Sequence, residues 1–303
     1  MVGTIRHVPI MCAEIFNILK GVNVPKKRIL DLTYGGGGHS RHILKNDPLV
    51  NIVALDRDPK AFRQCQNDSE MYQGRLIAKL GRHSEITSIF NNNTFHGAII
   101  DCGISSIQLS DLSRGFSFEC DNSLDMRINE SENILNAADV INKLDEKSLT
   151  ELIRFYGEDH FAEQISNKIC YRRKYAQIQN VKELADIVTS AVYSTKSVEA
   201  RRDKLNRRVH PATQTLLALR IFVNDELNEL QSGILASNSL LANNCPLIVI
   251  TFNSHEDRIV KQCFRNRQLW TFNEHRNKMT PNKEEIDNNP RSRSSRLRWA
   301  YKK

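Results

Sequence analysis

The chain has 303 residues, of which 40% are hydrophobic and 26% are charged, and its formal net charge is +8. These values are ordinary for a folded protein of about two domains. They exclude a disordered chain, a collagen-like repeat and a disulfide-stapled miniprotein. The excess of Lys and Arg favours an anionic partner without identifying it.

The cysteines and the beginning of the chain bear on its compartment. The seven cysteines are odd in number and none is spaced as CxxC, which predicts reduced thiols in a reducing compartment. No apolar run approaches the length that a membrane span requires, so we expect no membrane partner. Residues 1–7 have no apolar region of a signal peptide and too few arginines for a transit peptide, and the pattern therefore shows no clear targeting peptide.

Short apolar runs alternate with helical patterns over the first hundred residues. Strands are predicted at residues 28–33, 50–56, 75–79 and 96–101. The helical patterns between these runs begin near His39, Pro59 and Ser84, and a proline suits the first turn of a helix. This alternation predicts βαβ units and a parallel sheet with helices on both faces, which is a Rossmann-like α/β fold.

The pattern becomes helical between residues 113 and 208. Helices are predicted at residues 136–142, 146–156, 158–171 and 181–193. We therefore predict an inserted all-helical domain at 112–208, within a discontinuous Rossmann-like domain formed by 1–111 and 209–303. In the last part of the chain we predict one or two long helices at 211–241, a buried strand at 246–252, an antiparallel hairpin of 268–272 with 297–301, and a loop at 277–289.

A glycine-rich turn at residues 31–40, Asp-Leu-Thr-Tyr-Gly-Gly-Gly-Gly-His-Ser, follows the first predicted strand and opens a helix. Consecutive glycines let the backbone turn sharply and approach a ligand, and the helix N-terminus offers free N–H groups. Asp56 ends the second predicted strand, where a carboxylate can accept both hydroxyls of a ribose. This combination predicts a site for an adenosine-containing cofactor; the alternative is a glycine-rich turn without a ligand.

The type of cofactor follows from the residues around the glycines. The third glycine of the dinucleotide fingerprint is replaced by Ser40 or Arg41, which disfavours NAD. Asp31 would repel a pyrophosphate, but it suits the cationic sulfonium of S-adenosyl-L-methionine. We therefore predict the methyl donor, and with it the sheet of a class I S-adenosylmethionine-dependent methyltransferase.

A second polar cluster follows the fourth predicted strand and contains Asp101, Ser105, Ser106 and Gln108. It belongs to the same edge of the sheet as the glycine turn and Asp56, and ligands of open parallel sheets bind at that edge. The alternative is a serine-rich turn that caps a helix.

With these motifs the chain resembles the RsmH/MraW family, whose members methylate the exocyclic N4 of a cytosine in small-subunit ribosomal RNA. The resemblance runs in family order over nearly the whole chain. Its motifs lie at residues 7–11, 31–40, 54–59, 101–109, 114–118, 124–127, 156–158, 210–213, 218–224, 256–261 and 289–295. The tracts 137–142 and 219–230 are closer to the animal mitochondrial methyltransferase-like branch, which implies mitochondrial ribosomal RNA as substrate and a matrix location. A bacterial member would be cytoplasmic.

The resemblance also implies site residues and partners. Its cofactor contacts fall on Gly37, Gly38, His39, Asp56, His83, Asp101 and Gln108, and His83 stands where the family has an aromatic residue beside the adenine. The implied partner is small-subunit ribosomal RNA or a pre-ribosomal particle, with RNA recognition by the helical domain. The chain departs from the family at Leu216–Leu217, which is usually Phe-Gln, and at Asn253, which is usually His and here cannot take up a proton.

Transfer of a methyl group to an exocyclic amine requires that the amine be oriented, because its lone pair is conjugated into the ring. A carboxylate that accepts one amino N–H would do this. Asp101 is our candidate acceptor, with Ser105, Ser106 and Asn253 as partners of the base edge. The alternative is that Asp101 only holds the cofactor. The target base must be exposed or flipped out.

Other features have a functional and a simpler interpretation. The basic clusters at 201–208 and at 291–301, the latter with Trp299 and Tyr301, suit RNA phosphates and stacking, or they are solvated surface. Asp125 and Arg127 form either an ordering ion pair or a substrate contact. His39 and His42 have no third ligand nearby in sequence, so we expect no metal.

Two other functions are weighed against the methyltransferase. A catalytically weak, RNA-binding ribosome-assembly factor is suggested by the departures at Leu216, Leu217 and Asn253. A nicotinamide-dependent oxidoreductase is disfavoured by the missing third glycine.

Overall fold

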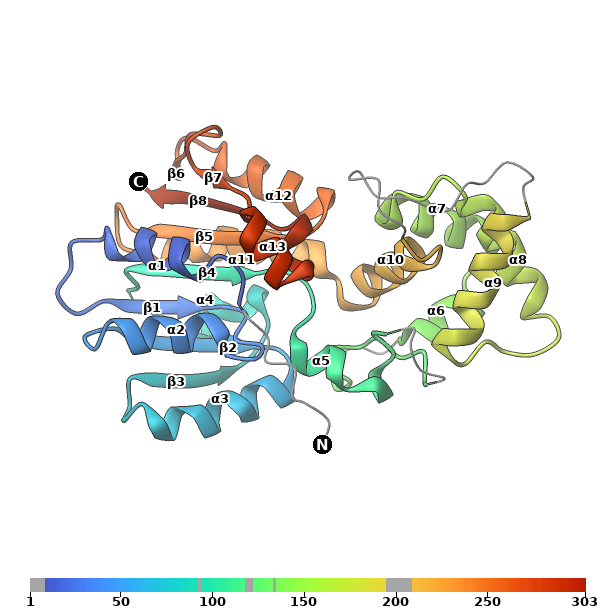
Figure 1. Ribbon diagram of the computed structural model, residues 1–303, viewed down its shortest axis with the longest axis horizontal. Coiled ribbons are helices and arrows are strands. Elements are labelled where there is room, and N and C mark those ends of the chain that lie inside the picture. Colours follow the sequence, from blue (N-terminus) through green and yellow to red (C-terminus); the bar gives the residue numbers. More distant parts are fainter. Residues whose placement is uncertain (1–8, 92–93, 118–121, 133–134, 195–208) are drawn as a thin grey trace. The chain divides into compact units, whose positions relative to one another are not determined.

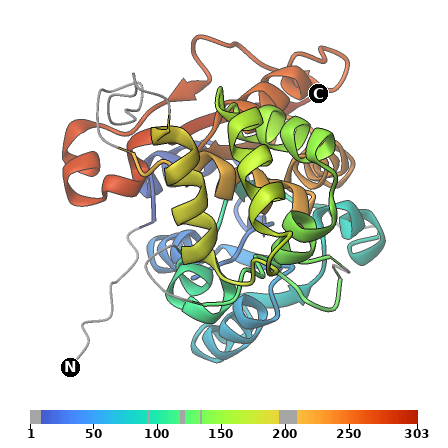
Figure 2. The same cartoon turned by 90° about the vertical axis from the view of Figure 1, so that its right-hand side faces the viewer.

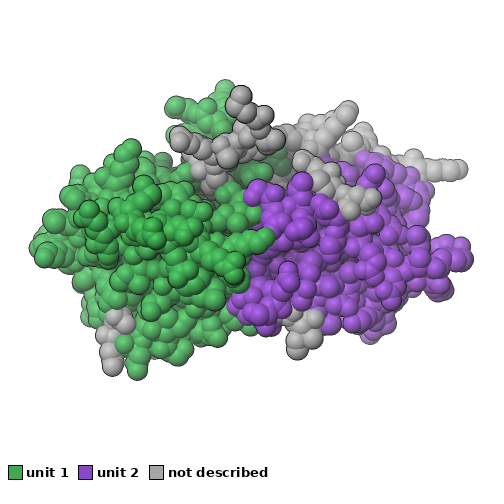
Figure 3. Space-filling model, turned by 90° about the horizontal axis from the view of Figure 1, so that it is seen from below, with its two compact units in different colours: residues 1–107, 227–303 green, residues 108–226 purple. Residues whose placement is uncertain are grey.

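The computed structural model describes residues 9–91, 94–117, 122–132, 135–194 and 209–303. The chain divides into two compact units, unit 1 with residues 1–107 and 227–303 and unit 2 with residues 108–226, which Figure 3 shows in green and purple. The second boundary therefore differs from the expected one at 208/209. Helix α10 (Thr213–Asn224) belongs to unit 2, because its buried Leu219 and Val223 pack in the core of that unit.

Unit 1 is built on one mixed sheet with the strand order β3-β2-β1-β4-β5-β8-β6, and β7 pairs with β8 (Figure 1). The strands are β1 (Arg28–Asp31), β2 (Asn51–Asp56), β3 (Leu76–Leu80), β4 (Gly97–Asp101), β5 (Pro246–Thr251), β6 (Trp270–Thr271), β7 (Lys278–Met279) and β8 (Arg296–Lys302). β1 to β5 are parallel, and β8 is antiparallel to β5, β6 and β7. The predicted Rossmann-like sheet and its antiparallel end are confirmed.

Helices cover both faces of this sheet. One face carries α1 (Cys12–Lys20), α2 (Gly38–Asn46) and α3 (Pro59–Met71), and the other carries α4 (Ile86–Ile89), α11 (Glu226–Leu240) and α12 (Ser254–Phe264). Because successive strand residues point to opposite faces, Ile29 packs with the first group and Leu30 with the second. β1, β2, β4 and β5 are buried on both faces, which is why these strands are apolar runs without alternation, whereas the edge strand β3 is mostly exposed.

The segment 277–289, expected to be a loop, contains β7 and the short helix α13 (Lys283–Asn288). No residue of α13 is buried, so hydrophobic periodicity gave no signal for it. The helix depends on its cap, because Asn282 Oδ1 accepts the N–H of Glu285 at 2.8 Å. The side chain of Glu285 also accepts the N–H of Met11 at 2.6 Å, which ties the helix to the residue before α1.

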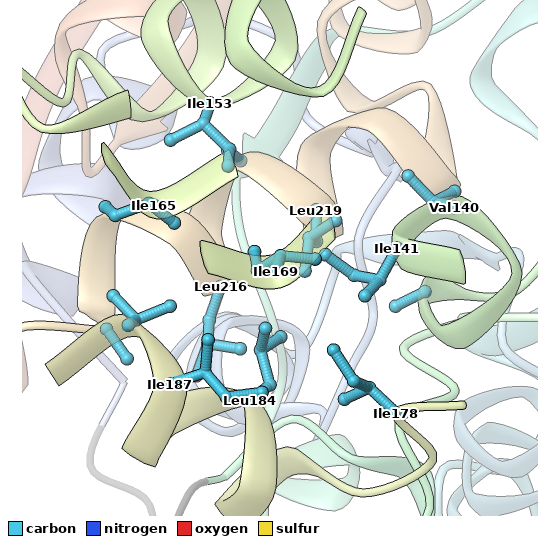
Figure 4. Packing of buried hydrophobic residues seen from close by; sticks show 14 of the residues in the cluster. Val140, Ile141, Ile153, Ile165, Ile169, Ile178, Leu184, Ile187, Leu216 and Leu219 are labelled. Atoms are coloured by element: carbon cyan, nitrogen blue, oxygen red, sulfur yellow. The ribbon is translucent and has the colours of Figure 1, made fainter. Parts of the chain in front are cut away.

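Among the described residues of unit 2, the regular secondary structure is helical, apart from an isolated bridge between Ser123 and Asn180. Besides α10 it contains α5 (Ser106–Ser110, which starts in unit 1), α6 (Ala137–Lys143), α7 (Glu146–Gly157), α8 (Ala162–Arg172) and α9 (Val181–Tyr193), and Figure 2 gives a second view of these helices. α8 starts four residues later than expected, because Glu158 takes a left-handed conformation that ends α7. The apolar residues of α6 to α10 meet in one core (Figure 4).

Candidate active site

The strand order creates a switch point between β1 and β4. Strands β1, β2 and β3 follow one another outward, and β4 then begins on the opposite side of β1. In open α/β sheets ligands bind at the carboxyl ends of the strands beside such a switch. The residues that follow β1 and β4, namely the glycine turn 35–38 and the segment 102–106, therefore occupy the expected position of a binding site.

The glycine turn has a conformation and surroundings that only glycine allows. Gly35 and Gly37 have φ values of 50° and 74°, a region that side chains disfavour. A Cβ on Gly37 would lie 2.4 Å from the Tyr34 hydroxyl, and a Cβ on Gly35 would lie 3.0 Å from Cβ of Ser105. The turn is therefore packed against Tyr34, which follows β1, and against Ser105, which follows β4.

A polar network holds this turn from the side of α3. The Tyr34 hydroxyl donates to Asp68, and Arg41 donates to the same carboxylate at 2.6 Å. Asp68 is 34 residues from Tyr34 in the sequence, and no local pattern indicated it. Only the packing of α3 beside the turn brings it there.

Asp56 connects the end of β2 to the turn. One carboxylate oxygen accepts the N–H of Gly35 at 2.7 Å, and the other accepts the N–H of Asp58 at 2.8 Å. Burial raises the pKa of Asp56 to about 7, although both backbone bonds act in the opposite direction. Each oxygen keeps a lone pair, so the ionised carboxylate can still accept a ribose hydroxyl.

Asp31 is almost completely buried and stabilises the start of α2. Its oxygens accept the Ser40 hydroxyl at 2.6 Å and the N–H of Thr33 at 3.1 Å. Burial raises the pKa of Asp31 against these hydrogen bonds. Because burial favours the neutral form, the charge of Asp31 is a weaker guide to the cofactor than the sequence suggested.

Asp101 ends β4 and has an uncommitted acceptor atom. Its N–H donates to the Thr33 hydroxyl at 2.7 Å, which fixes its backbone against the end of β1. One carboxylate oxygen lies 3.4 Å from Nε2 of His39. The other, Oδ1, is buried and has no hydrogen-bond partner among the residues that the structure describes.

His39 links Asp101 to the first helix of the chain. Only 6% of its surface is exposed, and its Nδ1 lies 3.4 Å from Sγ of Cys12. Burial lowers the pKa of His39, but the contacts with Asp101 and Cys12 outweigh burial and raise it well above 6.5. The imidazolium form therefore faces the Asp101 carboxylate. Sequence patterns pointed to neither Cys12 nor Thr33, since both contacts cross between elements.

His83 occupies a packed position in the 3-10 turn after β3. Its Nε2 lies 2.9 Å from the backbone oxygen of Leu32, and a Cβ on Gly233 of α11 would lie 3.0 Å from its Cβ. Burial lowers the pKa of this imidazole, so it is neutral. The structure shows how His83 is held, and its contact with an adenine stays a prediction.

Asn253 is engaged in capping α12. Its Oδ1 accepts the N–H of Glu256 at 3.0 Å, and its Nδ2 donates to the Glu256 carboxylate at 2.6 Å. Asparagine is a preferred N-cap residue, which explains how this position works without a histidine. Oδ1 keeps a second lone pair and Nδ2 a second N–H, so the contact with a base stays a prediction.

The remaining predicted residues are Gly38, at the start of α2, and Ser105, Ser106 and Gln108, which follow β4. Gly36 is close to Ser106, whose hydroxyl would lie 3.0 Å from a Cβ at that glycine. A Cβ on Gly38 would lie 2.7 Å from Pro9. Gln108 is buried in α5 and is the first residue of unit 2, so its assignment to the cofactor stays a prediction.

The basic clusters have a different outcome from the one expected. Residues 201–208 lie outside the described residues. In the C-terminal cluster, Arg298 is 3% exposed and donates to Asp257 at 2.6 Å, and Trp299 is 8% exposed. These two residues are part of the core of unit 1 because β8 is an inner strand of the sheet, and their expected contact with RNA is wrong.

Two simpler interpretations can also be compared with the structure. In unit 2, Arg127 and Asp125 form an ion pair at 2.7 Å that orders the chain before α6. Among the described residues, no group of three His, Cys, Asp or Glu side chains is placed to hold a metal ion, and no helix has the length and apolar character to cross a membrane.

Known proteins resemble this chain over its full described length. The family model of the MraW methylase family matches residues 4–303. A human protein named 12S rRNA N(4)-cytidine methyltransferase METTL15 is 34% identical over 98% of this chain and 82% of its own length. A Drosophila melanogaster protein named probable methyltransferase-like protein 15 homolog is 34% identical over 99% of this chain and 94% of its own.

Bacterial relatives match equally well. The protein named ribosomal RNA small subunit methyltransferase H from Persephonella marina is 36% identical over 98% of this chain and 99% of its own length. The family model and these relatives agree with the resemblance that the motifs carried. The chain belongs to the MraW methylase family.

Proposed function

We propose that the chain transfers the methyl group of S-adenosyl-L-methionine to the exocyclic N4 of a cytidine in small-subunit ribosomal RNA. Membership of a methylase family supports the reaction, and the names of the human and bacterial relatives support the substrate. One observation carries the proposal: a buried, unpartnered oxygen of Asp101 lies at the switch point of the sheet, tied to the glycine turn through Thr33.

The residues at the switch point suit the methyl donor. Asp56 would hold the ribose hydroxyls, and the glycine turn leaves no side chain between the backbone and a nucleoside. His39, His83, Gly37, Gly38 and Gln108 complete the predicted set. When bound, the cofactor supplies an electrophilic methyl carbon on a sulfonium.

Asp101 would orient the amine. Its Oδ1 can accept one N–H of the cytosine amino group, which aligns the nitrogen lone pair for in-line attack. Nε2 of His39 lies 3.4 Å from the other carboxylate oxygen of Asp101, which leaves Oδ1 for the amine. Ser105 and Ser106 lie on the same segment and are the candidates for contacts with the base edge. The alternative is that Asp101 only holds the cofactor. In that case loss of Asp101 would raise the Kd of the cofactor and leave kcat unchanged at saturating cofactor.

The finer substrate follows from the animal relatives. The human relative is named for 12S ribosomal RNA, and we propose the mitochondrial small-subunit RNA, and hence the matrix, for this chain. The departures from the family do not favour a catalytically weak assembly factor. Leu216 packs in the core of unit 2 (Figure 4), and Asn253 caps α12.

Mass spectrometry of nucleosides tests this function. The purified chain, incubated with S-adenosyl-L-methionine and small-subunit ribosomal RNA, should produce N4-methylcytidine, and RNA from cells that lack the gene should contain less of it. Unchanged N4-methylcytidine in those cells would reject the substrate. Calorimetry should show binding of S-adenosyl-L-methionine and none of NAD.

A further inference from the structure

Two large aromatic side chains are exposed at the end of α8. Tyr171 is 59% exposed and Tyr175 is 71% exposed. Their ring centroids are 5.4 Å apart at an interplanar angle of 64°, and the Tyr175 hydroxyl donates to the Tyr171 hydroxyl at 3.1 Å. The pair is therefore ordered while its rings remain open to solvent. Ordering two exposed rings does not bury apolar area, so packing within unit 2 does not explain the pair.

Basic side chains surround this pair. The sequence from Tyr171 to Tyr175 is Tyr-Arg-Arg-Lys-Tyr, with three cations between the rings. Arg173 is used inside unit 2, because it donates to the backbone oxygen of Ile141 at 2.6 Å. Lys174 is exposed and has no ion-pair partner within the part of the chain that the structure describes.

A groove of about 660 Å³ begins at Tyr171 and lies along α8 and α9, which pack side by side (Figures 1 and 2). Its polar lining includes Lys168, Arg172, Lys182, Glu183 and Asp186. Arg172 pairs with Glu183 at 2.7 Å. Lys182 is exposed and, like Lys174, is without an ion-pair partner among the described residues. The groove and the turn beside it are therefore positive overall.

We propose that this surface, defined by Tyr171, Tyr175, Lys168, Lys174 and Lys182 and called the Tyr171–Lys182 surface, binds a single-stranded segment of the RNA substrate. Bases stack on the two tyrosines, and the lysines contact phosphates. Aromatic platforms beside a cationic groove are how proteins hold single strands without reading their sequence. The identification of the bound polyanion as the RNA substrate rests on the proposed function.

The aromatic pair favours RNA over an acidic peptide. A peptide carboxylate would use the lysines alone, and it would leave both rings exposed and unexplained. A single strand of RNA offers a phosphate and a flat base at each nucleotide, which matches rings and lysines placed side by side.

Crosslinking and affinity measurements test the proposal. The probe is a fluorescein-labelled single-stranded RNA of about 20 nucleotides that contains 4-thiouridine. We expect crosslinked peptides that include Tyr171 or Tyr175. Y171A/Y175A should raise the Kd of this RNA at least about fivefold, because each stacked base contributes on the order of 1 kcal/mol or more. K174A/K182A should also reduce the dependence of log Kd on log salt, by roughly 0.7 for each lost phosphate contact.

Matched variants separate stacking from other effects. Y171F/Y175F keeps both rings and loses only the bond between the hydroxyls, so it should bind as the wild type does. Y193A removes another exposed tyrosine, 46% exposed at the end of α9, and should leave the Kd unchanged. If Y171A/Y175A unfolds, the proposal is still tested by the Kd of K174A/K182A and by the position of the crosslinks on the wild type. Y171F/Y175F then shows whether the hydroxyls are required.

The outcomes keep this inference apart from the proposed function. Crosslinks elsewhere, with an unchanged Kd in Y171A/Y175A and K174A/K182A, would overturn the Tyr171–Lys182 surface even if the enzyme methylates RNA. Binding of polyglutamate to this surface without binding of RNA would indicate an acidic protein as the partner and would also overturn the proposal. Wild-type protein that binds RNA through this surface but methylates none would instead overturn the proposed function alone.

Discussion

The switch point of unit 1 and the Tyr171–Lys182 surface of unit 2 use polar side chains in opposite ways. At the switch point Asp31, Asp56 and His39 are buried, and each contacts another part of unit 1: Asp31 accepts from Ser40, Asp56 accepts from Gly35, and His39 lies beside Asp101 and Cys12. On the surface of unit 2 the two tyrosines, Lys174 and Lys182 are exposed. The tyrosine hydroxyls bond to each other and the half-buried Lys168 donates to Ser190, whereas the exposed rings have no packing partner among the described residues that buries them. Burying charge is costly unless the geometry compensates it, so buried groups have set positions, whereas exposed ones are available to a partner.

The largest expected effect concerns a buried charge that the sequence grouped with the RNA-binding cations. Arg298→Ala leaves Asp257 without its most buried partner, and we expect a loss of about 3–5 kcal/mol in the free energy of unfolding. Lys174→Ala is the matched exposed variant and should change this free energy by less than about 0.5 kcal/mol. Urea denaturation measures both. Equal destabilisation by the two variants would break the contrast between buried and exposed cations.

Asp101→Ala separates the two roles that remain open for this residue. If Asp101 orients the amine, kcat should fall about 10²–10³-fold, as for loss of a preorganised polar contact in a transition state, while the Kd of S-adenosyl-L-methionine changes little. If it only holds the cofactor, the Kd rises and kcat is kept at saturating cofactor. Single-turnover kinetics together with calorimetry distinguish these results. The RNA Kd should be unchanged in either case.

Gly37→Ala tests the close packing of the glycine turn. The new Cβ would lie 2.4 Å from the Tyr34 hydroxyl at a φ of 74°, so we expect a destabilisation of about 2–4 kcal/mol from strain and overpacking. Gly74→Ala is the control, because Gly74 has a φ of 83° and no atom within 4 Å of its Cβ position. It should cost only about 1–2 kcal/mol. Similar losses in the two variants would show that conformation, and not contact, accounts for the effect at Gly37.

The smallest effect is a pH dependence. The pKa of Asp56 is raised to about 7, so a falling pH protonates the carboxylate that accepts the ribose. We expect the affinity for S-adenosyl-L-methionine to weaken about tenfold between pH 8 and pH 6. Asp56→Asn should bind less tightly and lose most of this dependence. Calorimetry at several pH values measures both, and an equally steep dependence in the variant would exclude Asp56.

The raised pKa of Asp56 affects stability in the opposite direction: a rising pH favours cofactor binding but lowers the free energy of unfolding. Between the ordinary pKa near 3.8 and about 7, the folded chain binds more protons at Asp56 than the unfolded chain does. The contribution of Asp56 to the free energy of unfolding therefore decreases as pH rises through this window. His39 also has a raised pKa; its contribution is present below about 6.5 and is lost as pH rises through the folded pKa.

Much of the fold could be read from local patterns. The predicted strands at 28–33, 50–56, 75–79, 96–101 and 246–252 coincide with β1 to β5 within two residues. Fully buried strands require continuous apolar runs, which are visible in the sequence. Helix α9 was placed at its observed bounds because its apolar residues repeat with helical spacing. Helices α1 and α13 were missed; α13 buries nothing, so it has no such repeat.

The second domain boundary could not be predicted from local sequence patterns. Nothing within α10 says which core receives its apolar face, and the helix was assigned to the wrong unit for that reason. The basic cluster of β8 failed similarly, since a run of arginines looks the same whether it lies on a surface or pairs with a distant Asp257.

What the sequence determined by itself is the chemistry available along β1, β2 and β4: a turn that only glycines can make, and carboxylates at strand ends. These depend on neighbours within a few residues, so their residue types reveal them. The tertiary structure alone decided how those groups are used. It paired Asp101 with His39, brought Asp68 under the turn, occupied Asn253 in a cap and left Tyr171 and Tyr175 open. Such pairings join residues far apart in the chain, and burial and hydrogen bonding between packed elements, which no local pattern encodes, select among them.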